Sequence, residues 1–217
     1  MTVSLPPPPP RRTTLKADET RELILQAAEA RFASKGFYPT RLEDIADDVG
    51  ITRTAVIYHF HDKETLYNAV LEKLFTQLNA RINATLDTNE ALLIRIEAAV
   101  TAWVLYAGEH PTLMRLFMRE VAGSEGGLRL EVSRYVAPMF SRLVGVLSEA
   151  QAAGLCRAID PVQFWSILAG ATMFFIMDAP LLAQDSNMAA DLRVQAYASE
   201  LTRVIHGLLD IEKAQRL

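Results

Sequence analysis

The sequence has little of several features that mark other classes of protein. Cys156 is the single cysteine among 217 residues, which excludes an intrachain disulfide and predicts a small buried side chain there. There is no signal peptide and no long apolar run, so we expect a cytoplasmic protein with no membrane partner. Glycine and proline are few outside the N-terminus, and strand-like alternation is absent. Apolar residues instead recur at helical spacing, which predicts an all-α fold.

Sequence patterns of common enzyme and metal sites are also missing. There is no HExxH, no Glu-x-x-His pair, no phosphate-binding glycine loop and no nucleophile elbow. The four histidines are dispersed along the chain, at His59, His61, His110 and His206. We therefore expect no catalytic residue, no metal and no cofactor. An enzyme that uses Asp and Glu residues of a helical domain is the disfavoured alternative.

The segment 40–66 predicts two short helices followed by the start of a third. Thr40 and Glu43 match a capping box, in which each side chain satisfies a backbone donor at a helix start. The first short helix is therefore predicted to begin near Arg41. Gly50 stands where a left-handed residue would end it.

A second short helix is predicted over residues 53–60, because Thr52 can accept a backbone hydrogen bond as its N-cap. Val56 and Phe60, one turn apart, would anchor it. Asp62 is the predicted N-cap of a longer third helix. Two helices joined by a short turn containing glycine have the spacing of a DNA-reading helix-turn-helix.

These residues resemble the N-terminal domain of TetR/AcrR-type transcriptional repressors. The residues that carry the resemblance are Gly50-Ile51-Thr52-Arg53, Tyr58-His59-Phe60, Asp62-Lys63-Glu64 and Leu66. A helix predicted over residues 21–35, with Gly36-Phe37 after it, matches the family's first helix. The resemblance covers roughly residues 18–78 and implies a three-helix DNA-binding domain, with the helix-turn-helix at about 41–60. Residues 79–217 would then form a larger helical domain for ligand binding and dimerisation.

The resemblance also implies which residues meet DNA. The second helix would enter the major groove, where Arg53 is the best candidate for a base contact, because a guanidinium pairs with guanine O6 and N7. A phosphate contact or a solvated side chain is the alternative for Arg53, and a partly buried imidazole is the alternative for His59. The expected DNA-binding residues are Thr40, Arg41, Thr52, Arg53, Thr54, Ile57, Tyr58, His59 and Lys63.

Two positions depart from the family pattern. The family frequently has Gly or Pro at the position of Thr54 and Tyr at that of Ile57. We expect these two side chains to face outward and to present methyl groups to thymine methyls of the operator. The sequence preference should therefore differ from that of relatives with the common residues.

The charge of the predicted DNA-binding domain is not basic. Residues 18–66 carry six basic and ten acidic side chains, a net charge of −4, although phosphate contacts normally supply much of the affinity for DNA. Residues 1–17 carry Arg11, Arg12 and Lys16 with no acid. This leader contains the run Pro6 to Pro10, which favours extended polyproline geometry. It is predicted to be a disordered leader or a basic arm that compensates for the acidic domain.

The remainder of the chain predicts further helices, each marked by a cap or a breaker. A helix is predicted over 91–107, ended by Gly108, and a short helix begins at His110-Pro111 and is followed by a loop at 123–127. A helical stretch then reaches Ala153 and is closed by Gly154, and Pro138 within it either begins a helix or kinks one. Asp160-Pro161 opens the next helix, and the last helix is predicted over 188–213.

The helix after Asp160 is apolar on more than one face, which implies a partner. Ala169-Gly170-Ala171 in this helix and Gly207 in the last one would let another helix approach closely. The family resemblance implies a homodimer made by the last two helices of each subunit. A monomer with a thoroughly buried central helix is the alternative.

An unknown small-molecule effector is the last expectation. Pockets are mostly apolar with a few polar groups, and a large apolar or aromatic ligand suits the residues of the middle helices. The candidate effector-binding residues are Trp103, Tyr106, His110, Phe117, Phe174, Met177 and Asp178, each of which could instead be part of the core. The family resemblance thus implies a homodimeric repressor released from double-stranded operator DNA by ligand. The alternative is a helical interaction protein or an activator that keeps the motif without ligand-regulated repression.

Overall fold

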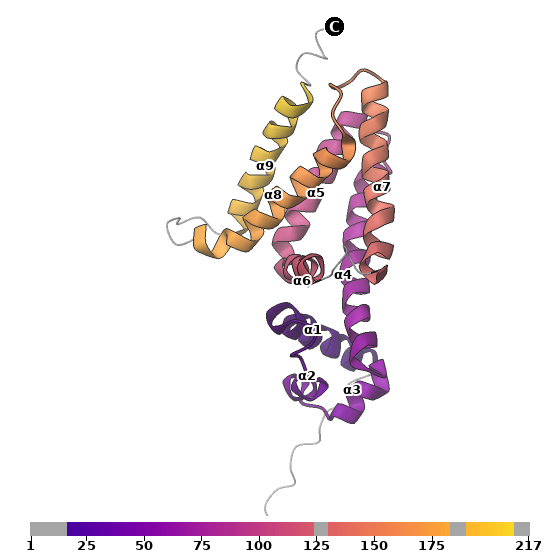
Figure 1. Cartoon of the computed structure of the whole chain (residues 1–217), viewed down its shortest axis with the longest axis vertical. Helices are drawn as coiled ribbons and strands as arrows, with labels where there is room; N and C mark the ends of the chain where they lie inside the picture. The colour runs from indigo at the N-terminus through magenta and orange to yellow at the C-terminus, as the bar shows by residue number, and fades with distance from the viewer. Residues whose placement is uncertain (1–16, 124–129, 183–189, 211–217) are drawn as a thin grey trace, which may run out of the picture.

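The computed structural model describes residues 17–123, 130–182 and 190–210, and these residues form nine α-helices and no strand (Figure 1). The all-α prediction is therefore confirmed. The helices are α1 (Ala17–Lys35), α2 (Leu42–Val49), α3 (Arg53–Phe60), α4 (Lys63–Leu86), α5 (Leu92–Glu109), α6 (Pro111–Gly123), α7 (Leu130–Ala152), α8 (Pro161–Leu182) and α9 (Ala190–Leu209).

Helices α1 to α3 form a unit at one end of the molecule, and α5 to α9 form a larger bundle at the other (Figure 1). Helix α1 begins four residues before the predicted start, with Asp18 and Glu19 in its first turn. Acidic side chains favour a helix N-terminus because the helix dipole is positive there. Gly36 adopts a left-handed conformation after α1, with φ 88°, as its position predicted.

The caps of the helix-turn-helix lie where they were predicted. Gly50 ends α2 with φ 73° and ψ 33°, and α3 spans the predicted residues 53–60. The side chain of Thr52 accepts the backbone N–H of Ala55 at 3.2 Å. The carboxylate of Asp62 accepts the backbone N–H of Thr65 at 2.7 Å at the start of α4. Local side-chain chemistry therefore fixes the start of α3 and the start of α4.

The capping box predicted at Thr40 is wrong. Helix α2 begins at Leu42, with Arg41 at the N-cap position and no side-chain cap. Thr40 is buried, and its hydroxyl donates to the carbonyl of Gly36 at 2.7 Å. This carbonyl, just beyond the end of α1, has no helical partner to accept from. A contact made across the turn thus takes the hydroxyl that the sequence pattern assigned to α2.

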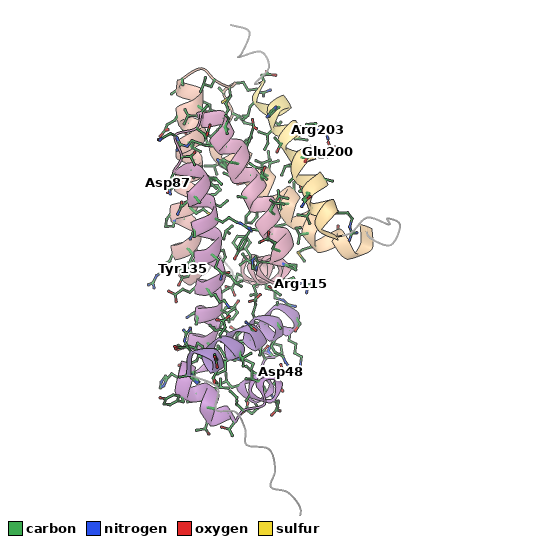
Figure 2. The ribbon with its side chains drawn as sticks, turned by 180° about the vertical axis from the view of Figure 1, so that it is seen from behind. Asp48, Asp87, Arg115, Tyr135, Glu200 and Arg203 are labelled. Atoms are coloured by element: carbon green, nitrogen blue, oxygen red, sulfur yellow. The ribbon has the colours of Figure 1, made fainter. Side chains whose placement is uncertain are left out.

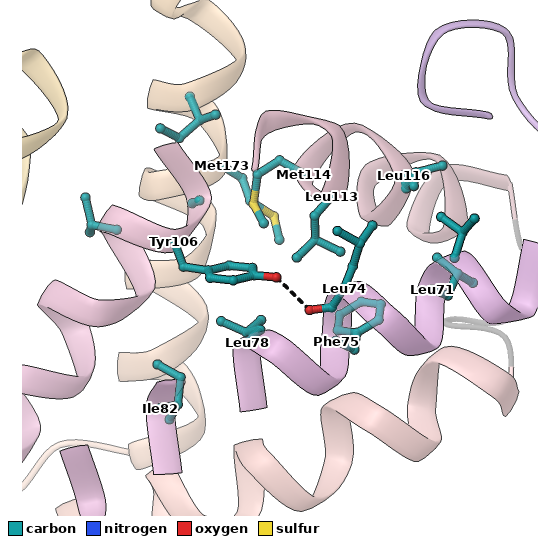
Figure 3. Packing of buried hydrophobic residues seen from close by; sticks show 14 of the residues in the cluster. Leu71, Leu74, Phe75, Leu78, Ile82, Tyr106, Leu113, Met114, Leu116 and Met173 are labelled. Atoms are coloured by element: carbon teal, nitrogen blue, oxygen red, sulfur yellow. Dashed lines mark hydrogen bonds between the residues drawn. The ribbon is translucent and has the colours of Figure 1, made fainter. Parts of the chain in front are cut away.

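Helix α4 continues through the boundary at residues 78 and 79 where the family resemblance ends. It packs against α1 in the N-terminal unit and against α5 and α7 in the bundle (Figure 1). Its buried stripe, which includes Leu71, Leu74, Leu78 and Ile82, belongs to a single core cluster that extends into both parts. Several of these side chains lie beside Leu113 and the other α6 residues in Figure 3.

One glycine of the bundle has a different role from the predicted one. Gly108 lies inside α5, which ends at Glu109 with His110 at the C-cap position, so the prediction that Gly108 terminates this helix is wrong. A Cβ atom at Gly108 would lie 2.7 Å from a Cγ atom of Val194 in α9. The missing side chain therefore permits close approach of α5 and α9 rather than a helix end.

Other predicted boundaries of the bundle are confirmed. Pro111 is the first residue of α6, Gly154 has φ 69° after α7, and Asp160 accepts the backbone N–H of Gln163 at 2.8 Å to cap α8. Pro138 lies inside α7, which runs through it. Of the loop predicted over 123–127, Gly123 is the last residue of α6. The rest of this loop, residues 1–16 of the leader and both predicted ends of the last helix lie outside the described residues.

The buried Cys156 agrees with its predicted packing role, and burial raises the pKa of its thiol. Within the described ranges, none of the helices combines the length and the hydropathy that a membrane crossing requires.

Candidate DNA-binding surface and effector cavity

Helix α3 has one buried side and one exposed side. Val56 and Phe60 are buried in the core of the N-terminal unit. Arg53, Thr54 and Tyr58 are exposed, and Tyr58 has 84% of its surface accessible to solvent. Because helical residues four apart share a face, Thr54 and Tyr58 lie together on the side opposite Val56 and Phe60, whereas Arg53 is exposed as the first residue of the helix. All three exposed residues are among those that were predicted to meet DNA.

The guanidinium of Arg53 is held by an acidic side chain of α2. Its Nε lies 2.8 Å from Oε1 of Glu43, and both side chains are more than half exposed. An exposed ion pair of this kind contributes little to stability. Its geometric effect is larger, because occupation of Nε leaves the two terminal Nη groups as the free fork for an acceptor pair. Sequence reasoning placed Glu43 in a capping box and missed this role.

Ile57 and His59 are only partly exposed. Ile57 is half-buried and packs against the buried core, so of the two side chains expected to face outward, Thr54 does so and Ile57 does so only in part. The imidazole of His59 meets the Tyr58 ring edge to face, with ring centroids 5.3 Å apart. His59 is therefore a half-buried neighbour of an exposed aromatic ring, which is close to the alternative considered for it.

Lys63 makes internal contacts instead of projecting outward. Its ammonium donates to the carbonyls of Phe37, Tyr38 and Thr40 at 3.0, 3.2 and 3.2 Å, and it lies 4.4 Å from the centroid of the Phe37 ring. The expectation that Lys63 faces phosphate does not match this arrangement. The segment between α1 and α2 presents three carbonyls without helical partners at one point, and a flexible cation satisfies them.

The acidic residues of α2 gather partly around a cation of α1. Arg31 forms a two-pronged hydrogen-bonded pair with Asp48, at 2.5 and 2.6 Å, and this pair lowers the pKa of Asp48. Asp48 lies within the helical unit at the lower end of Figure 2. The hydrogen bond to Asp48 and the charges of Asp44 and Asp47 raise the pKa of Arg31. Arg31 therefore offsets part of the negative charge on α2, on the side that faces α1.

The larger bundle contains an apolar cavity of about 450 Å³ that is partly open to solvent. Its wall is contributed by helices α4 to α8. Trp103 and Phe117 line it as predicted. The wall also contains residues that the sequence did not single out for this role, chiefly Phe75, Leu78, Met114, Met118, Met139, Phe140, Leu143, Trp165, Ser166 and Met173. This volume lies within the range of small-molecule sites.

The other predicted effector residues do not line this cavity. Tyr106 is buried, and its hydroxyl donates to the carbonyl of Leu74 at 2.8 Å (Figure 3). Its ring stacks on His110, with ring centroids 4.2 Å apart. Burial raises the pKa of Tyr106 to about 12. Phe174 and Met177 are exposed on α8, and Asp178 is half-buried. These five assignments are corrected: two residues pack together in the core and three lie elsewhere on α8.

Helices α8 and α9 carry an exposed apolar face. Val162, Ile167, Phe174 and Met177 on α8 and Val204 on α9 are large apolar residues with exposed side chains. A Cβ atom at Gly170 or Gly207 would meet nothing within 4 Å. Glu200 and Arg203, an exposed pair, lie on α9 in Figure 2. Neither glycine is therefore needed for packing among the described residues of one chain.

Comparison with known proteins agrees with this geometry. The family model for bacterial regulatory proteins of the tetR family matches residues 24–70. The chain is 31% identical over 144 residues to the HTH-type transcriptional repressor BepR of Brucella suis, covering 65% of this chain and 66% of that protein. It is 24% identical over 189 residues to the HTH-type transcriptional regulator RutR of Escherichia coli K12, covering 87% and 88%.

Solved structures show the same fold. The ketosteroid transcriptional regulator KstR2 of Mycobacterium tuberculosis has a TM-score of 0.69 and 21% identity, covering 84% of this chain and 92% of that one. HlyIIR, a hemolysin II transcriptional regulator, has a TM-score of 0.63 and 20% identity, covering 84% and 98%.

The capped reading helix, its exposed face and the helical bundle behind it define a DNA-binding transcriptional regulator of the helix-turn-helix class. Its matches are transcriptional regulators too. The chain belongs to the TetR family.

Proposed function

We propose that this protein is a homodimeric repressor that leaves its operator when a small apolar ligand fills the cavity of the bundle. The observation that carries the proposal is the combination, in one chain, of an outward-facing α3 and a cavity of about 450 Å³ walled by the helices behind it. The similarity to BepR, a transcriptional repressor, supports the direction of regulation.

Arg53 reads bases in this proposal. Its two free Nη groups match O6 and N7 of guanine, while Glu43 holds the Nε. Thr54 and the exposed edge of Ile57 contact thymine methyls. Arg41, Thr52, Tyr58 and His59 contact the phosphate backbone, and Lys63 positions α4 against the segment before α2. Thr40 is left out, because its side chain is buried.

The apolar face of α8 and α9 is the proposed dimer interface. Apolar side chains on this face stay in water in a single chain, although burial of such groups is the main favourable term in association. The open space at Gly170 and Gly207 admits the partner's helices at short range. A two-fold dimer would present two α3 helices to successive major grooves of the operator.

Helix α6 connects the cavity to the DNA-binding unit. On one side it supplies Met114 and Phe117 to the cavity wall. On the other side it contacts α1, where Arg119 donates to the carbonyl of Ser34 at 2.9 Å and Thr112 bonds to Glu29. A ligand that binds one position of α6 better than another would shift this contact, and such differential affinity is what a release mechanism requires.

Operator binding is tested with duplexes selected from a random pool and measured by fluorescence anisotropy at several salt concentrations. Arg53→Ala should weaken binding to the selected site about 10- to 100-fold, the range expected for one bidentate base contact. Arg157→Ala is the matched control, because this exposed arginine lies in the connection between α7 and α8, at the opposite end of the molecule (Figure 1). Equal losses in both variants would contradict the role of α3.

Dimerisation is tested by analytical ultracentrifugation. Phe174→Asp places a charge at a side chain that is 71% exposed in one chain, so it should leave the fold intact and yield monomers with weak operator binding. Ile94→Asp is the control, since it changes a half-exposed apolar residue of α5. A dimeric Phe174→Asp protein would overturn the proposed interface.

A further inference from the structure

The wall of the cavity has almost no free polar group. None of the side chains that form it is ionisable. The hydroxyl of Ser166 donates to the carbonyl of Val162 at 2.7 Å, and Nε1 of Trp165 donates to the carbonyl of Leu143 at 2.8 Å. Both donors are therefore already used within the protein. An ionised ligand would lose its hydration here without gaining a counter-charge, which is strongly unfavourable.

Trp103 is the exception. Its indole forms part of the cavity wall, and its Nε1 is buried without a hydrogen-bond acceptor among the described residues. Buried N–H groups in folded proteins almost always have a partner, and an unpaired one carries the full penalty of its desolvation. An acceptor on an occupant of the cavity would remove this penalty.

The wall around Trp103 can adapt to such an occupant. Four of its side chains are methionines, Met114, Met118, Met139 and Met173. Methionine is unbranched and changes shape at low cost, and its sulfur packs well against aromatic rings. Movement of these chains can bring an acceptor to the Trp103 N–H while aromatic walls such as Phe75 and Phe117 cover the apolar body.

We propose that the cavity binds a neutral, largely apolar molecule with one hydrogen-bond acceptor, such as a ketone or an ester carbonyl, and that Nε1 of Trp103 donates to this acceptor. Carboxylates and cations of similar size are rejected. This proposal rests on the proposed function only where it takes the bound molecule to be the effector. The chemical class of the ligand follows from the residues of the cavity wall alone.

Three probes of nearly the same shape test the assignment with the full-length protein. They are 2-acetylnaphthalene, 2-ethylnaphthalene and 2-naphthoate at pH 7.5, each competing with the fluorescent neutral probe N-phenyl-1-naphthylamine. The acetyl compound should bind about 10-fold more tightly than the ethyl compound, as expected for one hydrogen bond to a donor that is otherwise unpaired. The naphthoate should bind more weakly than both, because its charge is desolvated without a partner.

Trp103→Phe keeps an aromatic ring and removes the N–H. The preference for the acetyl compound should fall to about twofold or less, while the affinity for the ethyl compound stays nearly unchanged. Trp165→Phe is the matched control, because this indole also lines the cavity but donates to Leu143. The control should keep the preference of the unchanged protein.

Equal binding of the acetyl and ethyl compounds, an unchanged preference in Trp103→Phe, or tight binding of the naphthoate would overturn the assignment. Failure of all neutral probes to bind would do the same. Operator affinity measured with and without 2-acetylnaphthalene separates the two proposals. If this probe binds through Trp103 but leaves operator affinity unchanged, the ligand class stands and release by such a ligand fails.

Discussion

Replacement of Gly108 by alanine tests the close contact of α5 and α9. The new Cβ atom would lie 2.7 and 2.8 Å from the two Cγ atoms of Val194. A real Cβ essentially never lies so close to another carbon, and valine in a helix has one strongly preferred rotamer. The side chain cannot turn away, so the two helices must separate. We therefore expect Gly108→Ala to destabilise the protein although alanine is the better helix former.

The expected size follows from two opposing effects. Alanine in place of glycine inside a helix stabilises by about 0.8–1 kcal/mol. Forcing an extra methyl group into a filled space costs about 1–3 kcal/mol. The cost at Gly108 should be near the upper end of this range, because the methyl group would meet the stiff side chain of Val194. The net loss should be about 1–2 kcal/mol, which lowers the melting temperature of a chain of this size by about 2–8 °C.

Gly145→Ala is the matched control, because Gly145 also lies inside a helix and a Cβ atom there would meet nothing within 4 Å. It should stabilise the protein by up to about 1 kcal/mol. Unfolding by urea and by heat is compared at one protomer concentration. Removing the Cγ atoms with Val194→Ala should rescue Gly108→Ala in a double-mutant cycle. If Gly108→Ala stabilised the protein as much as Gly145→Ala, the reasoning on helix approach would be wrong.

Three further predictions concern single side chains. Thr52→Ala should destabilise the protein by about 1 kcal/mol through loss of the α3 cap, whereas Thr52→Asp should keep the cap but weaken operator binding by repelling phosphate; unchanged binding in Thr52→Asp would place this residue away from DNA. Lys63→Met should lower the free energy of unfolding, measured with urea, by about 1.5–3 kcal/mol, because the Lys63 ammonium donates to three carbonyls. Weaker DNA binding with a smaller salt dependence, at unchanged stability, would instead identify a phosphate contact. Stability should fall as the pH rises from 10 to about 12, because the pKa of folded Tyr106 is raised to about 12 and the unfolded chain loses this proton first; urea midpoints across this range should fall less in Tyr106→Phe.

The parts of the fold that could be predicted from the sequence are those fixed by neighbouring residues. Thr52 and Asp62 each accept from an N–H three residues away, and Gly50 needs only its own backbone conformation. Such contacts are short in sequence, so the pattern of residue types is enough to locate α3 and its ends. Most of the other helices were predicted from the same local rules, whereas their grouping into a three-helix DNA-binding domain and a larger helical domain came from the family resemblance.

The predictions that failed depended on contacts between distant segments. Lys63 finds its carbonyls 23 to 26 residues earlier in the chain, and Gly108 meets α9 more than 80 residues later. Apolar spacing likewise gives no means of separating a cavity wall from an outer face: Phe117 lines the cavity and Phe174 is exposed. These distinctions come only from the packed arrangement of helices.

Helix α4 is long enough to connect the DNA-binding unit directly to the cavity wall. Its 24 residues span roughly 36 Å without interruption, with the α3 connection at one end and the cavity wall at the other. If the helix tilts as a rigid rod about its upper end, a rotation of about 5° moves the lower end by roughly 3 Å. If the α3 helices of the two subunits of a dimer moved by this distance in opposite directions, their spacing would no longer match two half-sites one DNA turn apart. Under the proposed release mechanism, a small change in cavity shape would thus produce a larger displacement at α3.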